Sequence, residues 1–119
     1  MMSGRAIVVA IALIIPVGSG FAANEHGFAG RASYYSPDYH GLVASGVRYD
    51  PEKFTAAHKT LPFGTRLRVT DLKTGNSVVV IVNDRGPFTK GLILDLSLAA
   101  AKELHMLKRG IAKVRAEVQ

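Results

Sequence analysis

Apolar residues form one uninterrupted run in the middle of the chain and alternate with polar residues just before it. Val78 to Val82 are five β-branched residues in succession, and such a run predicts a strand buried on both faces. Residues 65–70 (TRLRVT) alternate as a half-exposed strand does. Residues 71–76 (DLKTGN) join the two and predict a tight turn, so we expect a β-hairpin at the centre of the fold.

Further segments have the alternation or the short apolar run of a strand: residues 31–35, 54–58, 91–96 and 110–118. Ser97 is a favourable N-cap for a helix over residues 98–104. We expect residues 24–30 to be a loose lead-in and residues 51–54 to form a single helical turn. About six short strands, one late helix and turns roughly every 8–12 residues predict a small, mainly β barrel.

Composition narrows the class of protein without choosing a function. The 119 residues are enough for one domain with a single core. The chain has no cysteine, which excludes a disulfide framework, a thiolate metal site and a lipid-bearing cysteine. The formal charge of +6 suits an anionic polymer, which includes nucleic acid, a membrane face and an acidic cell-wall glycan.

The first 22 residues have the three-part pattern of a secretory signal peptide. A short start with one arginine leads into an apolar stretch over residues 6–17 and a small, flexible stretch that ends at Ala22. The apolar stretch is short for a membrane-spanning helix, which needs about 20 residues, so an uncleaved anchor is the weaker alternative. We therefore expect an exported, periplasmic or extracellular domain over residues 23–119, with no stable membrane anchor and no nucleic-acid partner.

Asp84 is the strongest candidate for chemistry. It follows the stiff apolar run directly and opens a loop (NDRGP, residues 83–87) that Gly86 and Pro87 mark as tight. Loops that a rigid scaffold positions are where catalytic residues concentrate. The alternative is a structural carboxylate that binds its own turn or pairs with Arg85.

Four stretches resemble the rare lipoprotein A (RlpA-like) family: GRASYY (30–35), TAAHKTLPFGTRLRVT (55–70), VVVIVNDRGPF (78–88) and ILDLSLAAAKELHM (93–106). The resemblance covers roughly residues 28–118. It implies a six-stranded double-psi β-barrel with one or two short helices, a fold shared with expansins. It also implies an endolytic transglycosylase that cleaves peptidoglycan glycan strands without water and leaves 1,6-anhydro-muramic ends, with no cofactor or metal.

Asp84 suits that reaction, because a glycosidic bond breaks when an acid protonates the leaving oxygen. When the 6-hydroxyl of the sugar attacks in place of water, one carboxyl can serve first as acid and then as base. His58 lies in a matched motif, so the resemblance implies a role in orienting Asp84 or binding the sugar. Packing inside the barrel is the alternative for His58. Asp95 is expected to be structural and to fix the turn into the helix.

Five further residues are candidates for substrate contact. Tyr34, Tyr35 and Phe88 are expected to stack on sugar faces, although aromatic residues beside a strand are more often part of a core. Arg85 and Lys90 are expected to meet carboxylates of the glycan or its peptides, with a solvated surface position as the alternative. The remaining histidines are scattered without ligand-like spacing, so no metal site is expected.

One stretch departs from the family pattern. Members of the family carry a sequence similar to HGR-x-TA-(S/N)-GE before a Tyr-Asp pair, whereas residues 40–50 here read HGLVASGVRYD, one residue shorter. Val47 stands where the family has Glu, and an isopropyl group cannot exchange a proton. A second hypothesis is therefore a non-catalytic, expansin-like module that binds or loosens wall glycan.

Overall fold

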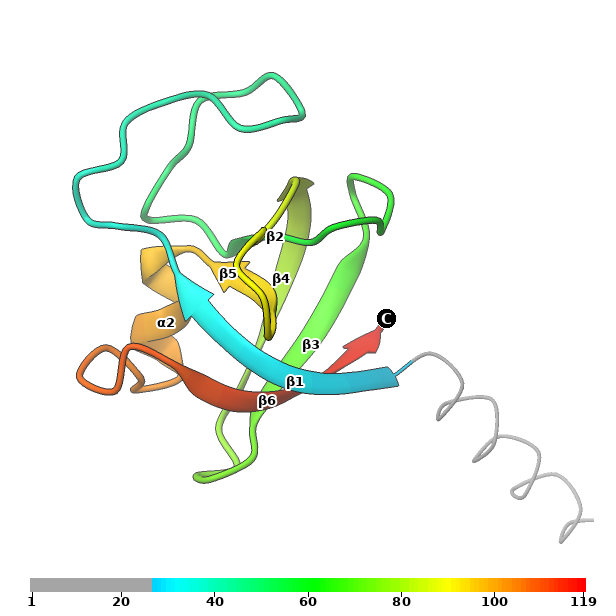
Figure 1. Ribbon diagram of the computed structural model, residues 1–119, viewed down its shortest axis with the longest axis vertical. Coiled ribbons are helices and arrows are strands. Elements are labelled where there is room, and N and C mark those ends of the chain that lie inside the picture. Colours follow the sequence, from blue (N-terminus) through cyan, green and yellow to red (C-terminus); the bar gives the residue numbers. More distant parts are fainter. Residues whose placement is uncertain (1–26) are drawn as a thin grey trace, which may run out of the picture.

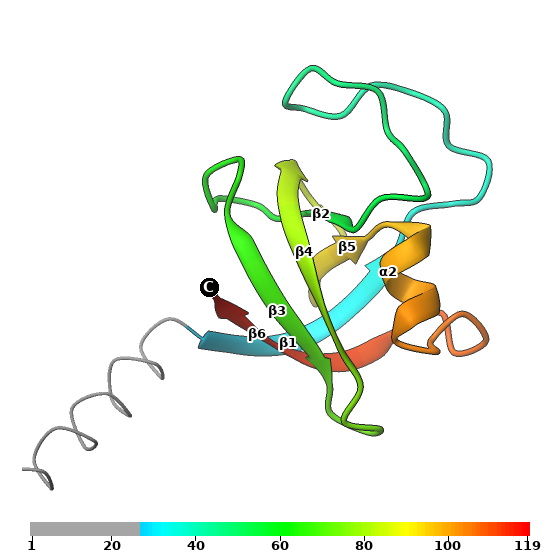
Figure 2. The same cartoon turned by 180° about the vertical axis from the view of Figure 1, so that it is seen from behind.

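Six strands close into one barrel in the computed structural model, which describes residues 27–119 (Figures 1 and 2). The elements are β1 (Gly27–Tyr34), β2 (Thr55–Ala57), β3 (Arg66–Asp71), β4 (Ser77–Asp84), β5 (Leu92–Leu96), the helix α2 (Leu98–Glu103) and β6 (Ala112–Val118). The predicted mainly β barrel of about six strands with a short late helix is therefore confirmed. The predicted signal peptide over residues 1–22 lies outside the described residues.

The strands follow one another around the barrel in the order β1-β5-β2-β4-β3-β6, which differs from their order in the sequence. The pairs β1–β5 and β2–β4 are parallel, and the other four pairs are antiparallel. Closure of the ring pairs every strand on both sides, so the barrel exposes no free strand edge. Strands distant in sequence thereby become neighbours, and this brings residues of β4 and β5 to the two sides of β2.

The central apolar run is buried on one face only, which corrects the sequence-based prediction. Val78, Val80 and Val82 point into the barrel and are at most 5% exposed, whereas Val79 and Ile81 on the outer face are half-buried. A closed barrel has one interior, and alternate residues of a strand point toward it and away from it. The outward valine and isoleucine satisfy β propensity rather than a second core.

The barrel interior continues under α2. The helix begins at Ser97, whose Oγ accepts hydrogen bonds from the backbone N–H groups of Ala100 (3.3 Å) and Thr55 (3.2 Å). This confirms the predicted N-cap. Ala100 and Ala101 are fully buried against the same core as the inward valines of β4, so α2 closes part of the barrel.

Two local predictions are wrong. Strand β1 begins at Gly27, inside the expected lead-in, because residues 27–32 pair with β6 along their whole length and the pairing supplies the hydrogen bonds. Residues 51–54 form a turn rather than a helical turn, with a bond from the Lys53 N–H to the Asp50 carbonyl (3.3 Å).

The long connection between β1 and β2 arches over the end of the barrel at which β4 ends (cyan to green in Figure 1). The β3–β4 turn lies at the opposite end of the barrel in both views (Figures 1 and 2). The end of β4, where the candidate Asp84 lies, is therefore covered by a segment from a distant part of the chain.

Candidate active site around Asp84

Three hydrogen-bond donors converge on the carboxylate of Asp84, the last residue of β4. The phenolic hydroxyl of Tyr35 donates to Oδ2. The backbone N–H groups of Ala44 (2.7 Å) and Arg85 (2.9 Å) both donate to Oδ1. All three donors are uncharged, so the carboxylate is held in one orientation without being neutralised.

A small hairpin in the β1–β2 connection delivers the N–H of Ala44. The Val43 N–H donates to the Val47 carbonyl (2.8 Å), and Gly46 completes the turn at a φ of 98°, in the left-handed region that favours glycine. The Ser45 N–H donates to the Asn83 carbonyl at the end of β4 (3.1 Å). The tip of the hairpin is therefore fixed to the strand that carries Asp84.

Tyr35 is held by a second aromatic residue. Its ring stacks on the ring of Tyr49, with centroids 4.4 Å apart and planes 14° apart, and both residues pack with Val43. The Tyr49 hydroxyl in turn accepts a hydrogen bond from the Leu98 N–H at the start of α2 (3.1 Å). Burial, together with the bond to Asp84 and its negative charge, raises the pKa of Tyr35 well above the usual phenol range. The Tyr35 hydroxyl is therefore protonated and remains a donor.

Arg85 turns its guanidinium away from Asp84. Nη1 donates to the backbone carbonyls of Leu61 (2.8 Å) and His58 (3.2 Å), and the group lies over the Phe63 ring, 4.1 Å from its centroid. The alternative of an Asp84–Arg85 ion pair is thus excluded, although Asp84 does bind the N–H of its own turn. Arg85 fixes the turn after β2, and its predicted contact with substrate stays a prediction.

His58 is neutral and has a defined tautomer. Its Nδ1 accepts hydrogen bonds from the N–H groups of Thr60 (3.1 Å) and Leu61 (3.0 Å), so the ring proton resides on Nε2. Burial, and then the positive charges of Arg85 and Lys59, lower the pKa of His58. The link to Asp84 is through the backbone, from the His58 N–H to the Asp84 carbonyl (3.1 Å). A catalytic role of the imidazole stays a prediction.

Asp95 is the second carboxyl near this site. Ala57 of β2 pairs with Asp84 on one side and with Asp95 on the other, which places both aspartates in one row across three strands. Ser33 on β1 donates a hydrogen bond to Oδ1 of Asp95 (3.1 Å). Burial raises the pKa of Asp95, and the charge of Asp84 adds to this rise against the opposing bond from Ser33.

The sequence-based role for Asp95 at the start of the helix is wrong, because Ser97 alone caps α2 with its side chain. The parallel and antiparallel pairings of β2 bring Asp84 and Asp95 together. No local pattern in the sequence indicates those pairings.

The structure brings Tyr35, rather than Tyr34, to Asp84. Successive side chains of a strand point to opposite sides, and the Tyr34 hydroxyl donates to the Leu107 carbonyl (2.7 Å), away from the site. Phe88, on the loop after Asp84, is 82% exposed, so its ring is open to solvent. Sugar stacking by Tyr34 and Phe88 stays a prediction. The alternation of residues 31–35 predicts that Tyr34 and Tyr35 point to opposite sides of the strand, but it does not predict which of them faces Asp84.

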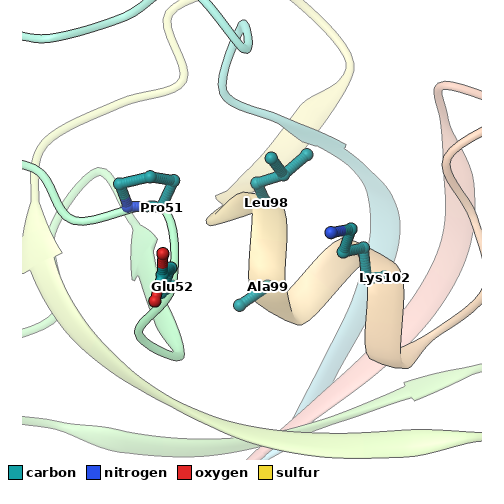
Figure 3. Close-up of a pocket in the computed structure, with 5 residues that line it drawn as sticks. All are labelled: Pro51, Glu52, Leu98, Ala99 and Lys102. Atoms are coloured by element: carbon teal, nitrogen blue, oxygen red, sulfur yellow. The ribbon is translucent and has the colours of Figure 1, made fainter.

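Two hollows on the surface of the described residues, of about 320 and 260 Å³, lie beside α2, and neither is lined by Asp84. The larger one lies between the β1–β2 connection and α2 (Figure 3), with the following lining: Pro51, Glu52, Leu98, Ala99 and Lys102. Convergence of donors, rather than depth, distinguishes the surroundings of Asp84.

Two further properties concern residues 27–119 alone. No three His, Cys, Asp or Glu side chains in this range gather closely enough to hold a metal ion. None of its helices has the length and apolarity that crossing a lipid bilayer requires.

Comparisons with known proteins support this fold and add a family match. Residues 27–116 match the family model described as lytic transglycolase. The chain is 50% identical over 100 residues to the probable endolytic peptidoglycan transglycosylase RlpA of Nostoc sp., covering 84% of this chain and 24% of that protein. It is 49% identical over 98 residues to the endolytic peptidoglycan transglycosylase RlpA of Vibrio cholerae, covering 80% and 37%. The chain thus spans well under half the length of either relative.

Solved structures with the same fold include the Streptomyces papain inhibitor (TM-score 0.63, 25% identity, 78% of this chain and 94% of that one). The expansin of Clavibacter michiganensis is similar in fold, with a TM-score of 0.62 at 24% identity, over 78% of this chain and 50% of that one. These similarities confirm the expected double-psi β-barrel. The family match over most of the described residues, with half of the aligned residues identical to RlpA proteins, shows that this chain belongs to the RlpA-like lytic transglycolase family.

Proposed function

We propose that the protein is an exported lytic transglycosylase that cleaves the glycan strands of peptidoglycan and leaves 1,6-anhydro-muramic ends. The observation that carries the proposal is the Asp84 carboxylate, oriented by three uncharged donors at the loop end of the barrel. The relatives named endolytic peptidoglycan transglycosylase support the substrate class. The pattern of residues 1–22 supports export, and the formal charge of +6 suits an anionic wall polymer.

Asp84 acts in two successive steps of this reaction. Its carboxyl proton passes to the glycosidic oxygen as the bond from C1 to that oxygen breaks. The carboxylate then accepts the proton of the sugar's own 6-hydroxyl as that oxygen bonds to C1. The proton count balances over the two steps, and no water and no second carboxylate enter the bond changes.

His58 and Phe88 have supporting roles in this proposal. His58 offers a neutral Nε2–H as a hydrogen-bond donor toward the sugar, because Nδ1 is occupied by two backbone donors. The exposed ring of Phe88 offers a stacking surface beside the loop of Asp84.

A second candidate function rests on Val47. This residue stands where the family pattern has Glu, and its side chain is 53% exposed on the hairpin that covers Asp84. A site without that carboxylate retains the means to bind glycan but lacks one group with which to exchange protons. The alternative function is therefore a non-catalytic, expansin-like module that binds or loosens the wall.

The test is digestion of purified glycan strands, with and without stem peptides, followed by mass analysis of the products. We expect anhydro-muramic ends with the wild-type protein and their loss with Asp84→Asn. The matched control is Asp38→Asn, which removes the charge of an aspartate on an exposed turn of the β1–β2 connection.

Two outcomes decide between the functions. Strands that sediment with the protein but remain uncut would establish the binding module and overturn the enzyme. In that case Val47→Glu shows whether the missing carboxylate alone separates the two, because cleavage should then appear in the variant.

A further inference from the structure

We propose that Tyr35 is a positioning residue that confines proton exchange by Asp84 to a single oxygen, Oδ2. The inference rests on the proposed function, in which Asp84 gives and takes a proton. It goes further by assigning the atom at which this happens and the side chain that selects it.

The argument begins with the acceptor sites of the carboxylate. An ionised carboxylate has about four lone-pair sites, two on each oxygen. Both sites of Oδ1 are occupied, by the N–H groups of Ala44 (2.7 Å) and Arg85 (2.9 Å). On Oδ2, the Tyr35 hydroxyl occupies one site. Within residues 27–119 no further donor reaches the carboxylate, which leaves one free site, on the oxygen that Tyr35 contacts.

Tyr35 can select that site because it is itself fixed. It is 7% exposed, its ring stacks on Tyr49 with centroids 4.4 Å apart, and its backbone N–H donates to the Leu96 carbonyl (3.0 Å). The raised pKa of the phenol keeps the hydroxyl protonated, so it remains a donor to Oδ2. The free lone pair of Oδ2 is thereby held in a fixed direction.

The consequence concerns the orientation of the carboxylate. The donor on Oδ2, together with the two N–H groups on Oδ1, prevents rotation of the carboxylate and so holds the free lone pair in place for proton transfer. Loss of the Tyr35 hydroxyl should therefore reduce the rate of proton transfer.

The test compares Tyr35→Phe with the matched control Tyr39→Phe. Each variant loses one phenolic hydroxyl from the β1–β2 connection, but the Tyr39 hydroxyl donates to the Leu42 carbonyl (2.5 Å) and not to Asp84. We expect Tyr35→Phe to lower kcat about tenfold with little change in KM, because substrate binding does not require a fixed carboxylate whereas proton transfer does. Tyr39→Phe should keep the wild-type kcat and KM. A Tyr35→Phe kcat equal to that of the wild type, or a loss that appears in KM instead, would overturn the inference.

A second measurement does not depend on cleavage and so separates this inference from the proposed function. Tyr35→Phe, Asp84→Ala and the double variant form a thermodynamic cycle on unfolding in urea. We expect the two changes to be coupled by at least about tenfold in the unfolding equilibrium constant near pH 7. If the effects of the two changes on the free energy of unfolding were additive, the contact between Tyr35 and Asp84 would be overturned even if the protein cleaves glycan. Coupling without any cleavage would retain the contact and reject the enzyme.

Discussion

Two aspartates end neighbouring strands of the barrel, and the donors around their carboxylates differ in charge. Asp71 ends β3 beside the β3–β4 turn, is fully buried, and forms an ion pair with Arg109 as well as accepting the Lys73 N–H (2.9 Å). Asp84 ends β4 at the loop end, is half-buried, and binds only neutral donors. The nearest cation in sequence, Arg85, binds backbone carbonyls instead.

The difference is the one expected between a structural carboxylate and the carboxylate that we propose to exchange a proton. Burial by itself would raise the pKa of Asp71, but the bond from Arg109 and the backbone N–H groups of Lys73 and Thr74 outweigh it and lower the pKa. Protonation of Asp71 therefore breaks an ion pair and removes stability. Protonation of Asp84 disturbs only bonds to uncharged groups, which is compatible with a group that repeatedly gains and loses a proton.

The largest effect is expected from removal of the cation at Asp71. Arg109→Met leaves the fully buried carboxylate of Asp71 without its charged partner, which should reduce the free energy of unfolding in urea titration at pH 7 by more than the loss of a surface ion pair does. The matched control is Arg115→Met, whose partner Glu117 lies 3.8 Å away, with both side chains 36% exposed. Such a surface pair should contribute about 1 kcal/mol or less.

The same pair predicts a pH dependence. Because the pKa of Asp71 is lowered in the folded state, its stabilisation is present above the ordinary aspartate value of about 4 and is lost as the pH falls through the folded value. The loss of unfolding free energy that Arg109→Met causes should therefore be smaller at low pH. A loss of unfolding free energy of equal size at pH 7 and at pH 3 would show that Arg109 stabilises the fold by packing rather than by charge.

A second pair of variants should separate stability from activity. Asp71→Asn removes the charge that Arg109 needs and should destabilise the fold by about 2 kcal/mol without affecting cleavage by the remaining folded protein. Asp84→Asn should abolish cleavage, since a carboxamide can neither protonate the glycosidic oxygen nor accept the proton of the 6-hydroxyl. It should destabilise the fold less than Asp71→Asn, because the amide oxygen still accepts the two backbone N–H groups. Unfolding curves and glycan digests on the same samples test both. If Asp71→Asn and Asp84→Asn lost the same cleavage activity per folded molecule, the distinction between a structural and a catalytic aspartate would be wrong.

The sequence predicted the elements better than the neighbourhood of the site. The cap at Ser97 and the hairpin turn at residues 71–76 follow from local residue types, and both are observed. The loop predicted over residues 83–87 begins later than expected, because β4 continues through Asn83 and Asp84. The direction of the Arg85 side chain and the choice of Tyr35 over Tyr34 depend on the ring of strands. In that ring β2 lies between β4 and β5, and the β1–β2 connection folds back over β4. These contacts join residues 24 to 49 positions apart, which periodicity does not report.

His58 offers a smaller, pH-dependent test on the side of Asp84. Its pKa is lowered, so the stability of the neutral form is present above the ordinary histidine value of about 6.5 and declines as the pH falls through the folded value. Unfolding free energies between pH 7.5 and pH 5, in intervals of roughly half a unit, should decline less steeply for His58→Asn than for the wild type. His105→Asn, on an exposed turn, is the control and should follow the wild type. Parallel slopes in all three proteins would mean that the bonds to Nδ1 do not discriminate against the charged ring.

The smallest effect concerns Asp95, the aspartate that shares a row with Asp84 and that forms no ion pair within residues 27–119. Its pKa is raised by burial and by the charge of Asp84, so the folded state favours the protonated form. The wild type therefore loses stability as the pH rises through the folded pKa, while Asp95→Asn, which retains an acceptor for Ser33, does not. The variant should be more stable than the wild type at pH 7 by about 1 kcal/mol or less, and this gain should vanish below about pH 4. In an Asp84→Asn background the gain should be smaller, because one source of the raised pKa is gone. A gain of the same size in both backgrounds would mean that the two carboxyls do not sense each other, and Asp84 would then exchange its proton independently of the only other acid in its row.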